Sequence, residues 1–211
     1  SNFSSAFVGR DIAYCAYQFD YGDGKVWQGI QRQMSVRFRG VKVYDPRLDI
    51  SPGANPTNSS YIAYSSNPAL CLADFLMSPV GGAFPADEIN WAWVVSAANV
   101  CDELVVDKDG VNQKRYTCNG VITCDPRQFE DNVKRLVDSM LGYITYRDGQ
   151  WFMRAGAWSS VSAGNSIVRN DWLSIDQITL VSGREARYNE VMCFYVEPAS
   201  NWQRKESPSR K

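Results

Sequence analysis

Residues 125–153 read DPRQFEDNVKRLVDSMLGYITYRDGQWFM, and this stretch gives the clearest secondary-structure predictions in the chain. Asp125 can cap a helix, Pro126 suits its first position, and Gly142 can end it. The apolar side chains between these residues recur at helical spacing, as Phe129, Val133, Leu136 and Met140. The sequence therefore predicts a helix that runs from about residue 126 to the glycine.

A tight hairpin is predicted directly after this helix. Two runs rich in aromatic residues, 143–146 and 150–153, flank Arg147-Asp148-Gly149. Asp-Gly between two such runs is the strongest short-range signal for a hairpin, because both residues tolerate the positive φ of the turn. A further strand is expected from Arg115 to Thr123. Residues 115–155 therefore predict the order strand, helix, hairpin.

Two more helices are predicted upstream. Asn67 can cap the first, with Pro68 at its first position and Ser78 near its end. The second is expected to begin near residues 85–88, whose two acidic side chains suit the positive end of the helix dipole, and to run to about Leu104. Its apolar stripe is predicted to be Ile89, Trp93, Ala97, Val100 and Leu104.

The first part of the chain predicts strands followed by a loop. Ile12 to Tyr21 and Val26 to Val43 read as strands joined by an Asp23-Gly24 turn. Residues 45–60 are polar and contain three prolines, so they predict a long loop.

We therefore predict an α+β fold in which an antiparallel β-sheet region precedes a strand-helix-hairpin domain with about three helices. Further strands are expected at 175–181 and 191–196. The predicted organisation is a β-rich segment at 1–60 that completes an upstream domain, an α+β domain at 61–197, and a polar linker at 198–211. The chain begins with Ser and Asn and has no initiator Met there, so we interpret it as a piece of a longer protein.

Composition restricts the classes of function. The chain has 211 residues, of which 45% are hydrophobic, and this is enough to form a packed core. Lys and Arg number 22 against 23 Asp and Glu, so no net field draws polyanions to the surface and a nucleic-acid binder is disfavoured. No apolar run approaches the roughly 20 residues that a membrane-spanning helix needs.

The chain contains no histidine. This absence excludes Ser-His-Asp and Cys-His nucleophile pairs, HExxH zinc sites and any imidazole general base. The six cysteines form no CxxC pair and are interpreted as reduced core thiols: Cys15, Cys71, Cys101, Cys118, Cys124 and Cys193. The spacing of Cys118 and Cys124 matches no zinc knuckle, and a site that added Cys101 would need a convergence that spacing does not show. We expect no metal and no cofactor.

Several segments, taken in order, resemble one known family. They read RGVKVYDPR at 39–47, NPALCLADFL at 67–76, AANVCDE at 97–103 and RYTCNGVI at 115–122. The pattern continues with Gly149-Gln150-Trp151 and with Asn189-Glu190-Val191 leading to Tyr195, Pro198 and Trp202. Over residues 30–203 the set resembles the middle hub region of phage tail-tip proteins, the family typified by the lambda host-specificity protein J.

The resemblance implies a structural role and no enzymatic activity. Members of this family are central subunits at the distal end of the tail tube, form trimeric rings around the channel through which DNA leaves, and contact other tail-tip and tape-measure proteins. Similar hub folds occur in contractile baseplates. The implied location is the tail tip of the virion, after assembly in the host cytoplasm. The fibronectin-like and C-terminal regions that such proteins use for host recognition lie outside this chain, so receptor binding is expected elsewhere.

Trp91 and Trp93 are the candidate interface residues. Residues at i and i+2 on a helix point to different sides. We therefore expect one indole in the core and the other at an interface, because Trp is enriched where a partner later buries a surface.

Two other functions stay open. A tail-associated cell-wall glycosidase needs two carboxylates and no histidine, and Asn99, Asp102 and Glu103 have helical spacings that place them near one another. Such a cluster is more often a solvated face or an interface contact. A carbohydrate- or receptor-binding module would stack sugars on aromatic side chains, with Trp151, Trp158 and Trp172 as the candidates.

Overall fold

The computed structural model describes residues 36, 38–51, 53–107, 110–122, 125–158, 190, 192–197, 200 and 203–206. They divide into two compact units, the first ending at Ala157 and the second beginning at Trp158. Each unit is described by itself. The fold is a mixed α+β fold, with three α-helices and four two-stranded antiparallel sheets among the described residues.

Helix α1 spans Pro68–Met77, as the sequence predicts. The side-chain oxygen of Asn67 accepts a hydrogen bond from the backbone N of Ala69 at 3.1 Å, and Pro68 occupies the first position, where no intrahelical donor is needed. Ser78 follows the last turn as the C-cap. The helix supplies the centre of the core, through the fully buried side chains of Leu70, Leu72 and Leu76.

Helix α2 spans Trp91–Asp102, so the predicted start near residue 85 is wrong. Asn90 caps it, and the Asn90 side chain accepts a hydrogen bond from the backbone N of Trp93 at 3.3 Å. Residues Ala86–Glu88 form a separate 3₁₀ turn instead. Ile89 cannot continue that turn because it makes a parallel bridge with Trp151.

The end and the buried face of α2 also differ from the prediction. Asp102 is the last helical residue, and Leu104 begins a strand in which its side chain is 64% exposed. The buried face of the helix is displaced by about one residue from the predicted stripe and shares Ala97 with it. Its buried residues are Val94, Ala97, Ala98 and Cys101.

Helix α3 spans Phe129–Asp138 and follows a short 3₁₀ helix at Pro126–Gln128. The predicted apolar stripe is confirmed, because Phe129 packs against the core and three members are buried: Val133, Leu136 and Met140. The residue with positive φ after the helix is Leu141, at 48°, and not Gly142. Gly142 instead allows a close approach, because a Cβ there would lie 2.2 Å from the carbonyl oxygen of Arg154.

Four antiparallel pairs make up the described sheets. In the first unit β1 (Lys42–Tyr44) pairs with β2 (Ile62–Tyr64), β3 (Leu104–Val106) with β4 (Asn112–Lys114), and β5 (Tyr143–Arg147) with β6 (Gln150–Arg154). In the second unit β7 (Phe194–Glu197) pairs with β8 (Gln203–Glu206). The predicted hairpin is confirmed, since Asp148 and Gly149 have φ values of 51° and 74° between β5 and β6.

The strand predicted at 115–123 is wrong, because the strand of this region is β4 and residues 115–122 lie outside it. Their backbone instead runs beside the end of α2. The N of Arg115 donates to the O of Glu103 at 2.8 Å, and the N of Tyr116 donates to the O of Cys101 at 3.1 Å. These two bonds satisfy backbone groups that a longer sheet would otherwise have paired.

Other predictions fall near or beyond the described residues. The polar stretch after β1 is a loop that ends in the 3₁₀ helix Ser59–Tyr61. Strand β8 lies in the segment predicted as a linker. Strands β1 and β2 pair across the predicted division at residue 60, and that division stays a prediction. The strands predicted at 12–21 and 175–181 lie outside the described residues.

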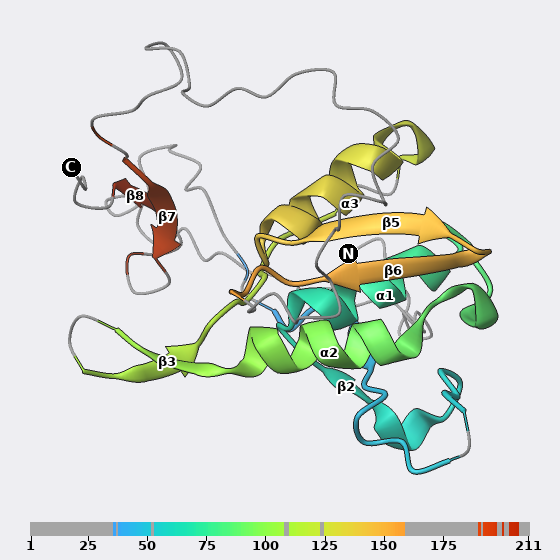
Figure 1. Cartoon of the computed structure of the whole chain (residues 1–211). Coiled ribbons are helices and arrows are strands. Elements are labelled where there is room, and N and C mark those ends of the chain that lie inside the picture. Colours follow the sequence, from blue (N-terminus) through green and yellow to red (C-terminus); the bar gives the residue numbers. More distant parts are fainter. Residues whose placement is uncertain are drawn as a thin grey trace, which may run out of the picture. The chain divides into compact units, whose positions relative to one another are not determined.

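The core of the first unit forms where the three helices meet the β5–β6 hairpin (Figure 1). Helix α1 packs against both α2 and α3, while β6 contacts α2 and β5 contacts α3. The β3–β4 hairpin extends beyond the C-terminal end of α2 (Figure 1). None of the described helices combines the length and apolarity needed to cross a lipid bilayer.

Replacing Gly142 with Ala is expected to destabilise the first unit. The added methyl group would meet the backbone of Arg154, so the turn after α3 must shift, which costs about 1–3 kcal/mol in the free energy of unfolding. Urea denaturation followed by circular dichroism measures the loss. Gly120→Ala is the matched control, because nothing lies within 4 Å of a Cβ there. Equal losses in both variants would contradict the close-approach explanation.

Candidate functional site

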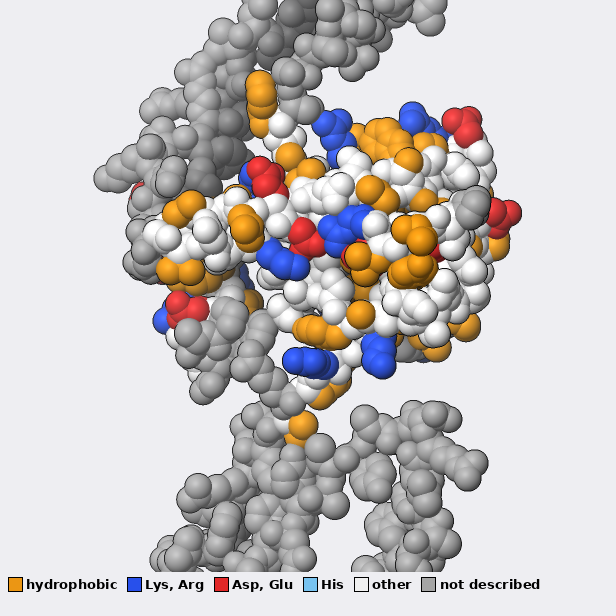
Figure 2. Space-filling view, turned by 90° about the horizontal axis from the view of Figure 1, so that it is seen from below, with side chains coloured by type: hydrophobic (Ala, Val, Ile, Leu, Met, Phe, Trp, Pro, Cys, Tyr) orange, Lys and Arg blue, Asp and Glu red, His pale blue; other side chains and the backbone are white. Residues whose placement is uncertain are grey.

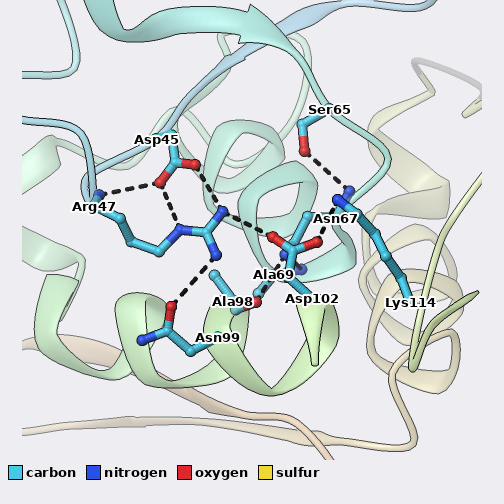
Figure 3. Close-up of polar contacts among 9 residues, drawn as sticks. All are labelled: Asp45, Arg47, Ser65, Asn67, Ala69, Ala98, Asn99, Asp102 and Lys114. Atoms are coloured by element: carbon cyan, nitrogen blue, oxygen red, sulfur yellow. Dashed lines mark hydrogen bonds and ion pairs between the residues drawn. The ribbon is translucent and has the colours of Figure 1, made fainter. Parts of the chain in front are cut away.

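The loop after β1 carries an arginine that connects it to α2. Nη2 of Arg47 lies 2.7 Å from Oδ2 of Asp45 and 2.9 Å from Oδ2 of Asp102. Its Nε donates to Oδ1 of Asp45 at 2.9 Å, and its Nη1 donates to Oδ1 of Asn99 at 3.4 Å. One guanidinium therefore holds the loop against the last turns of the helix (Figure 3).

Two further residues join the same cluster. Nζ of Lys114, on β4, lies 2.5 Å from Oδ1 of Asp102. The buried Asn67 side chain donates from Nδ2 to the O of Ala98 at 2.9 Å, while its Oδ1 caps α1 (Figure 3). We call these residues the Arg47 network: Asp45, Arg47, Asn67, Asn99, Asp102 and Lys114.

The charges of the Arg47 network balance. Two carboxylates face two cations. The hydrogen bonds that Arg47 donates to the Asp45 carboxylate raise the pKa of Arg47, against the opposing effect of burial. Burial alone would raise the pKa of Asp102, but its bonds with Lys114 and Arg47 outweigh burial and lower it. A general acid needs the opposite shift. The network is therefore a set of satisfied ion pairs.

Helical spacing placed Asn99, Asp102 and Glu103 near one another, but in the structure they do not form one cluster. Asn99 and Asp102 both bind Arg47, whereas Glu103 turns away and pairs with Arg115, its Oε2 lying 2.9 Å from Nη2. The sequence prediction missed Arg47 and Lys114 as partners. The Asp-Pro-Arg stretch signalled only a turn, and that turn exists, because the backbone N of Arg47 donates to Oδ1 of Asp45 at 3.0 Å.

A second set of hydrogen bonds orders the loop that carries Arg47. The hydroxyl of Tyr44 donates to Oδ2 of Asp49 at 2.6 Å, and the backbone N atoms of Ser51 and Asn55 also donate to this carboxylate. The hydrogen bond from Tyr44 is the main cause that lowers the pKa of Asp49 to about 2. Burial and the same hydrogen bond raise the pKa of Tyr44 to about 12. The loop is thus fixed around one carboxylate.

Trp91 and Trp93 are both half-buried and make different contacts. The indole Nε1 of Trp91 donates to the O of Ala86 at 2.9 Å, and its ring meets Tyr44 edge to face at 5.3 Å, so Trp91 packs against the core. The ring of Trp93 meets Phe152 at 5.7 Å. Trp93 also lines a surface hollow of about 300 Å³ together with Ala92, Ser96 and Arg154. A role for either indole at an interface stays a prediction.

The three tryptophans considered for sugar stacking differ in exposure. Trp151 is half-buried, because Phe84 and Tyr146 pack on it with ring centroids 5.1 and 5.0 Å away. It borders a hollow of about 450 Å³ beside α3, whose charged lining residues are Glu130 and Lys134. Trp158 is 89% exposed, and Trp172 lies outside the described residues.

The cysteines of the described residues are free thiols: Cys71, Cys101, Cys118 and Cys193. The expected core location is wrong for Cys193, which is exposed on the second unit. Cys15 and Cys124 lie outside the described residues. In the described part of the chain no three His, Cys, Asp or Glu side chains are placed to hold a metal ion.

The face drawn in Figure 2 carries no continuous patch of one charge. Lys and Arg side chains alternate there with Asp, Glu and hydrophobic side chains. Such a surface does not concentrate a polyanion along that face.

No model of a protein family matches this chain, and no curated protein is significantly similar to it. A function must therefore be inferred from the residues of the chain itself.

Arg47→Ala is expected to lower the free energy of unfolding by about 1.5–3 kcal/mol, because it removes hydrogen bonds between charged groups and leaves Asp45 and Asp102 facing each other. Arg127→Ala is the matched control. Its guanidinium is exposed and pairs with Asp125 within the same turn, so the expected loss is below about 0.5 kcal/mol. Urea denaturation measures both variants, and similar losses would contradict a special role for Arg47.

The contribution of Asp102 to stability is expected to depend on pH. Its pKa is lowered in the folded protein, so its contribution is complete above the ordinary aspartate pKa of about 4 and is lost as the pH falls through the lowered value. The stability difference between the natural chain and Asp102→Asn should therefore be largest near neutral pH and shrink below about pH 4. Urea denaturation at a series of pH values measures it, and a constant difference would refute this interpretation.

Proposed function

We propose that this chain is part of the central hub of a phage tail tip. In that role it is a structural subunit that surrounds the tail channel and connects the tail tube to the parts that recognise the host. The starting point is the resemblance of residues 39–47, 67–76 and 97–103 to the family of the lambda host-specificity protein J.

The observation that carries the proposal is the convergence of these three segments in the Arg47 network. The first segment supplies Asp45 and Arg47, the second supplies Asn67, and the third supplies Asn99 and Asp102 (Figure 3). Residues that pair with one another in a fold are expected to occur together in a sequence, because the loss of one leaves its partner unpaired. The shared contacts give the resemblance a physical basis that three unrelated short matches would lack.

The surroundings of the acidic residues support a structural role over the glycosidase alternative. That chemistry needs two carboxylates that face a bound sugar. Of the two hollows described above, the larger is lined by one carboxylate, that of Glu130, and the smaller by none. The carboxylates of the Arg47 network are held by cations instead. Among the described residues, no specific contact favours the glycosidase or the sugar-binding module.

The partners in this proposal are identical hub subunits in a trimeric ring, other tail-tip proteins and the tape-measure protein. A closed ring needs two different, complementary surfaces on each subunit. Two surfaces of the first unit carry exposed apolar groups that suit such contacts. One is the hollow lined by Trp93, and the other is the β3–β4 hairpin, where Leu104 and Val106 are more than half exposed. DNA passes through the assembly without specific binding.

The proposal predicts that the protein containing this chain sits at the distal end of the tail. Antibodies raised against the first unit, labelled with gold and applied to purified particles, are expected to mark the tail tip in electron micrographs. Deleting the coding sequence is expected to abolish tails, because a hub subunit is needed for the tube to assemble.

Two outcomes would contradict the proposed function. One is label that is spread along the tail or found only in the unassembled fraction. The other is normal, infectious particles after deletion. Release of fragments from purified peptidoglycan by the isolated chain, lost when a single carboxylate is neutralised, would favour the glycosidase instead.

A further inference from the structure

Two cysteines from separate segments meet beside the start of α1. Cys71 lies in the first turns of α1, and its Sγ is 3.6 Å from the O of Ser65. Cys118 follows β4 in the chain, and its backbone N donates to the O of the neighbouring Ser66 at 2.8 Å. The carbonyl groups of two adjacent residues therefore bind these two cysteines and place their thiols near each other. The two thiols also interact, and this interaction changes the pKa of both.

The segment that carries Cys118 is fixed just before this cysteine, at Tyr116. The backbone N of Tyr116 donates to the O of Cys101, and the Tyr116 hydroxyl donates to the O of Gly156 at 2.6 Å. Both Cys71 and Cys118 pack at the margin of the core and are neither fully buried nor fully exposed. They can thus meet a small reagent without unfolding of the unit.

The other two cysteines of the described residues lack this combination. Cys101 is fully buried, so a reagent cannot reach it in the folded unit. Cys193 is exposed but lies in the second unit. Of the cysteines in the described part of the chain, Cys71 and Cys118 alone combine access with a neighbouring thiol.

We propose that Cys71 and Cys118 form a redox modification site, which closes to a disulfide on reaction with a low-molecular-weight disulfide and reopens with a thiol reductant. This inference rests on the placement of the two thiols beside Ser65 and Ser66 and is independent of the proposed hub function.

The hydrogen bond of Cys71 favours Cys118 as the first nucleophile, because the Cys71 thiol donates its proton to the O of Ser65 and is held in the protonated form. The interaction between the two thiols acts in the same direction, since it raises the pKa of Cys71 and lowers the pKa of Cys118. The Cys118 thiolate attacks one sulfur of the small disulfide, forms a mixed disulfide and releases one small thiolate. The sulfur of Cys71 then loses its proton to that thiolate and attacks the sulfur of Cys118. The second small thiolate leaves and takes up the proton first released by Cys118.

The overall change balances. Two protein thiols are oxidised to one disulfide, and one small disulfide is reduced to two thiols. The new bond would join α1 to the segment after β4 and enclose α2 in a covalent loop. Such a loop stabilises the folded unit mainly by restricting the unfolded chain.

The test uses the whole chain with Cys193→Ser, which removes the exposed thiol. The reduced protein is incubated with oxidised glutathione and digested without reduction, and its peptides are identified by mass spectrometry. The expected product is one peptide pair joined through Cys71 and Cys118. The loss of two free thiols and a rise of several degrees in the midpoint of thermal unfolding should accompany it, and dithiothreitol should reverse both.

Two single variants test the order of the steps. Cys71→Ser is expected to retain one glutathione on Cys118, because the resolving thiol is gone. Cys118→Ser is expected to take up glutathione at Cys71 at least several-fold more slowly. Circular dichroism checks the fold of each variant, and the peptide map of the Cys193→Ser protein decides the main claim if either variant fails to fold.

Two results would overturn the proposal. In the first, Cys71 and Cys118 stay reduced in folded protein under conditions that oxidise Cys193 in the natural chain. In the second, either residue forms its disulfide with another cysteine, such as Cys101 or Cys124.

Discussion

The first unit depends on one guanidinium that faces two carboxylates from different parts of the chain. An arginine can do this because its planar group presents several donors in fixed directions, whereas a lysine offers a single flexible point charge. Asp45 orients Arg47 within the loop, and Asp102 receives it at the end of α2. Lys114 then pairs with the second oxygen of Asp102 and attaches β4 to the same point. Each partly buried charge has an opposite charge beside it, which offsets its loss of hydration.

This arrangement separates the polar residues that maintain the fold from the surfaces that remain for partners. The acidic groups of the Arg47 network are occupied by cations, and the loop that carries Arg47 is closed around Asp49. The exposed surface includes the hollow beside Trp93 and the apolar side chains of the β3–β4 hairpin. A subunit whose work is to bury surface against neighbours needs this division, because its own stability must not depend on groups that a partner will cover.

The sequence predicted the elements whose signals are local. Asn67-Pro68 marks the start of α1, and Asp148-Gly149 marks the β5–β6 turn, because a few adjacent residues decide each conformation. The start of α2 was predicted too early because residues 85–88 also offer a plausible helix start. The bridge between Ile89 and Trp151, residues far apart in the chain, selects Asn90 as the cap. The Arg47 network was missed for the same reason, since its residues become a set only after distant segments pack together.

Asn67 couples the formation of one helix to the docking of another. Its side-chain oxygen caps α1 and its amide nitrogen binds the backbone of α2, and the whole side chain is buried. If α1 formed without α2 beside it, the Asn67 oxygen could still cap the helix, but the amide nitrogen would lack its partner on α2. A buried donor without a partner costs free energy. Local helix formation and long-range assembly thus share a single side chain, so partly folded states in which one helix persists without the other are disfavoured. The unit should consequently lose its structure as one cooperative body.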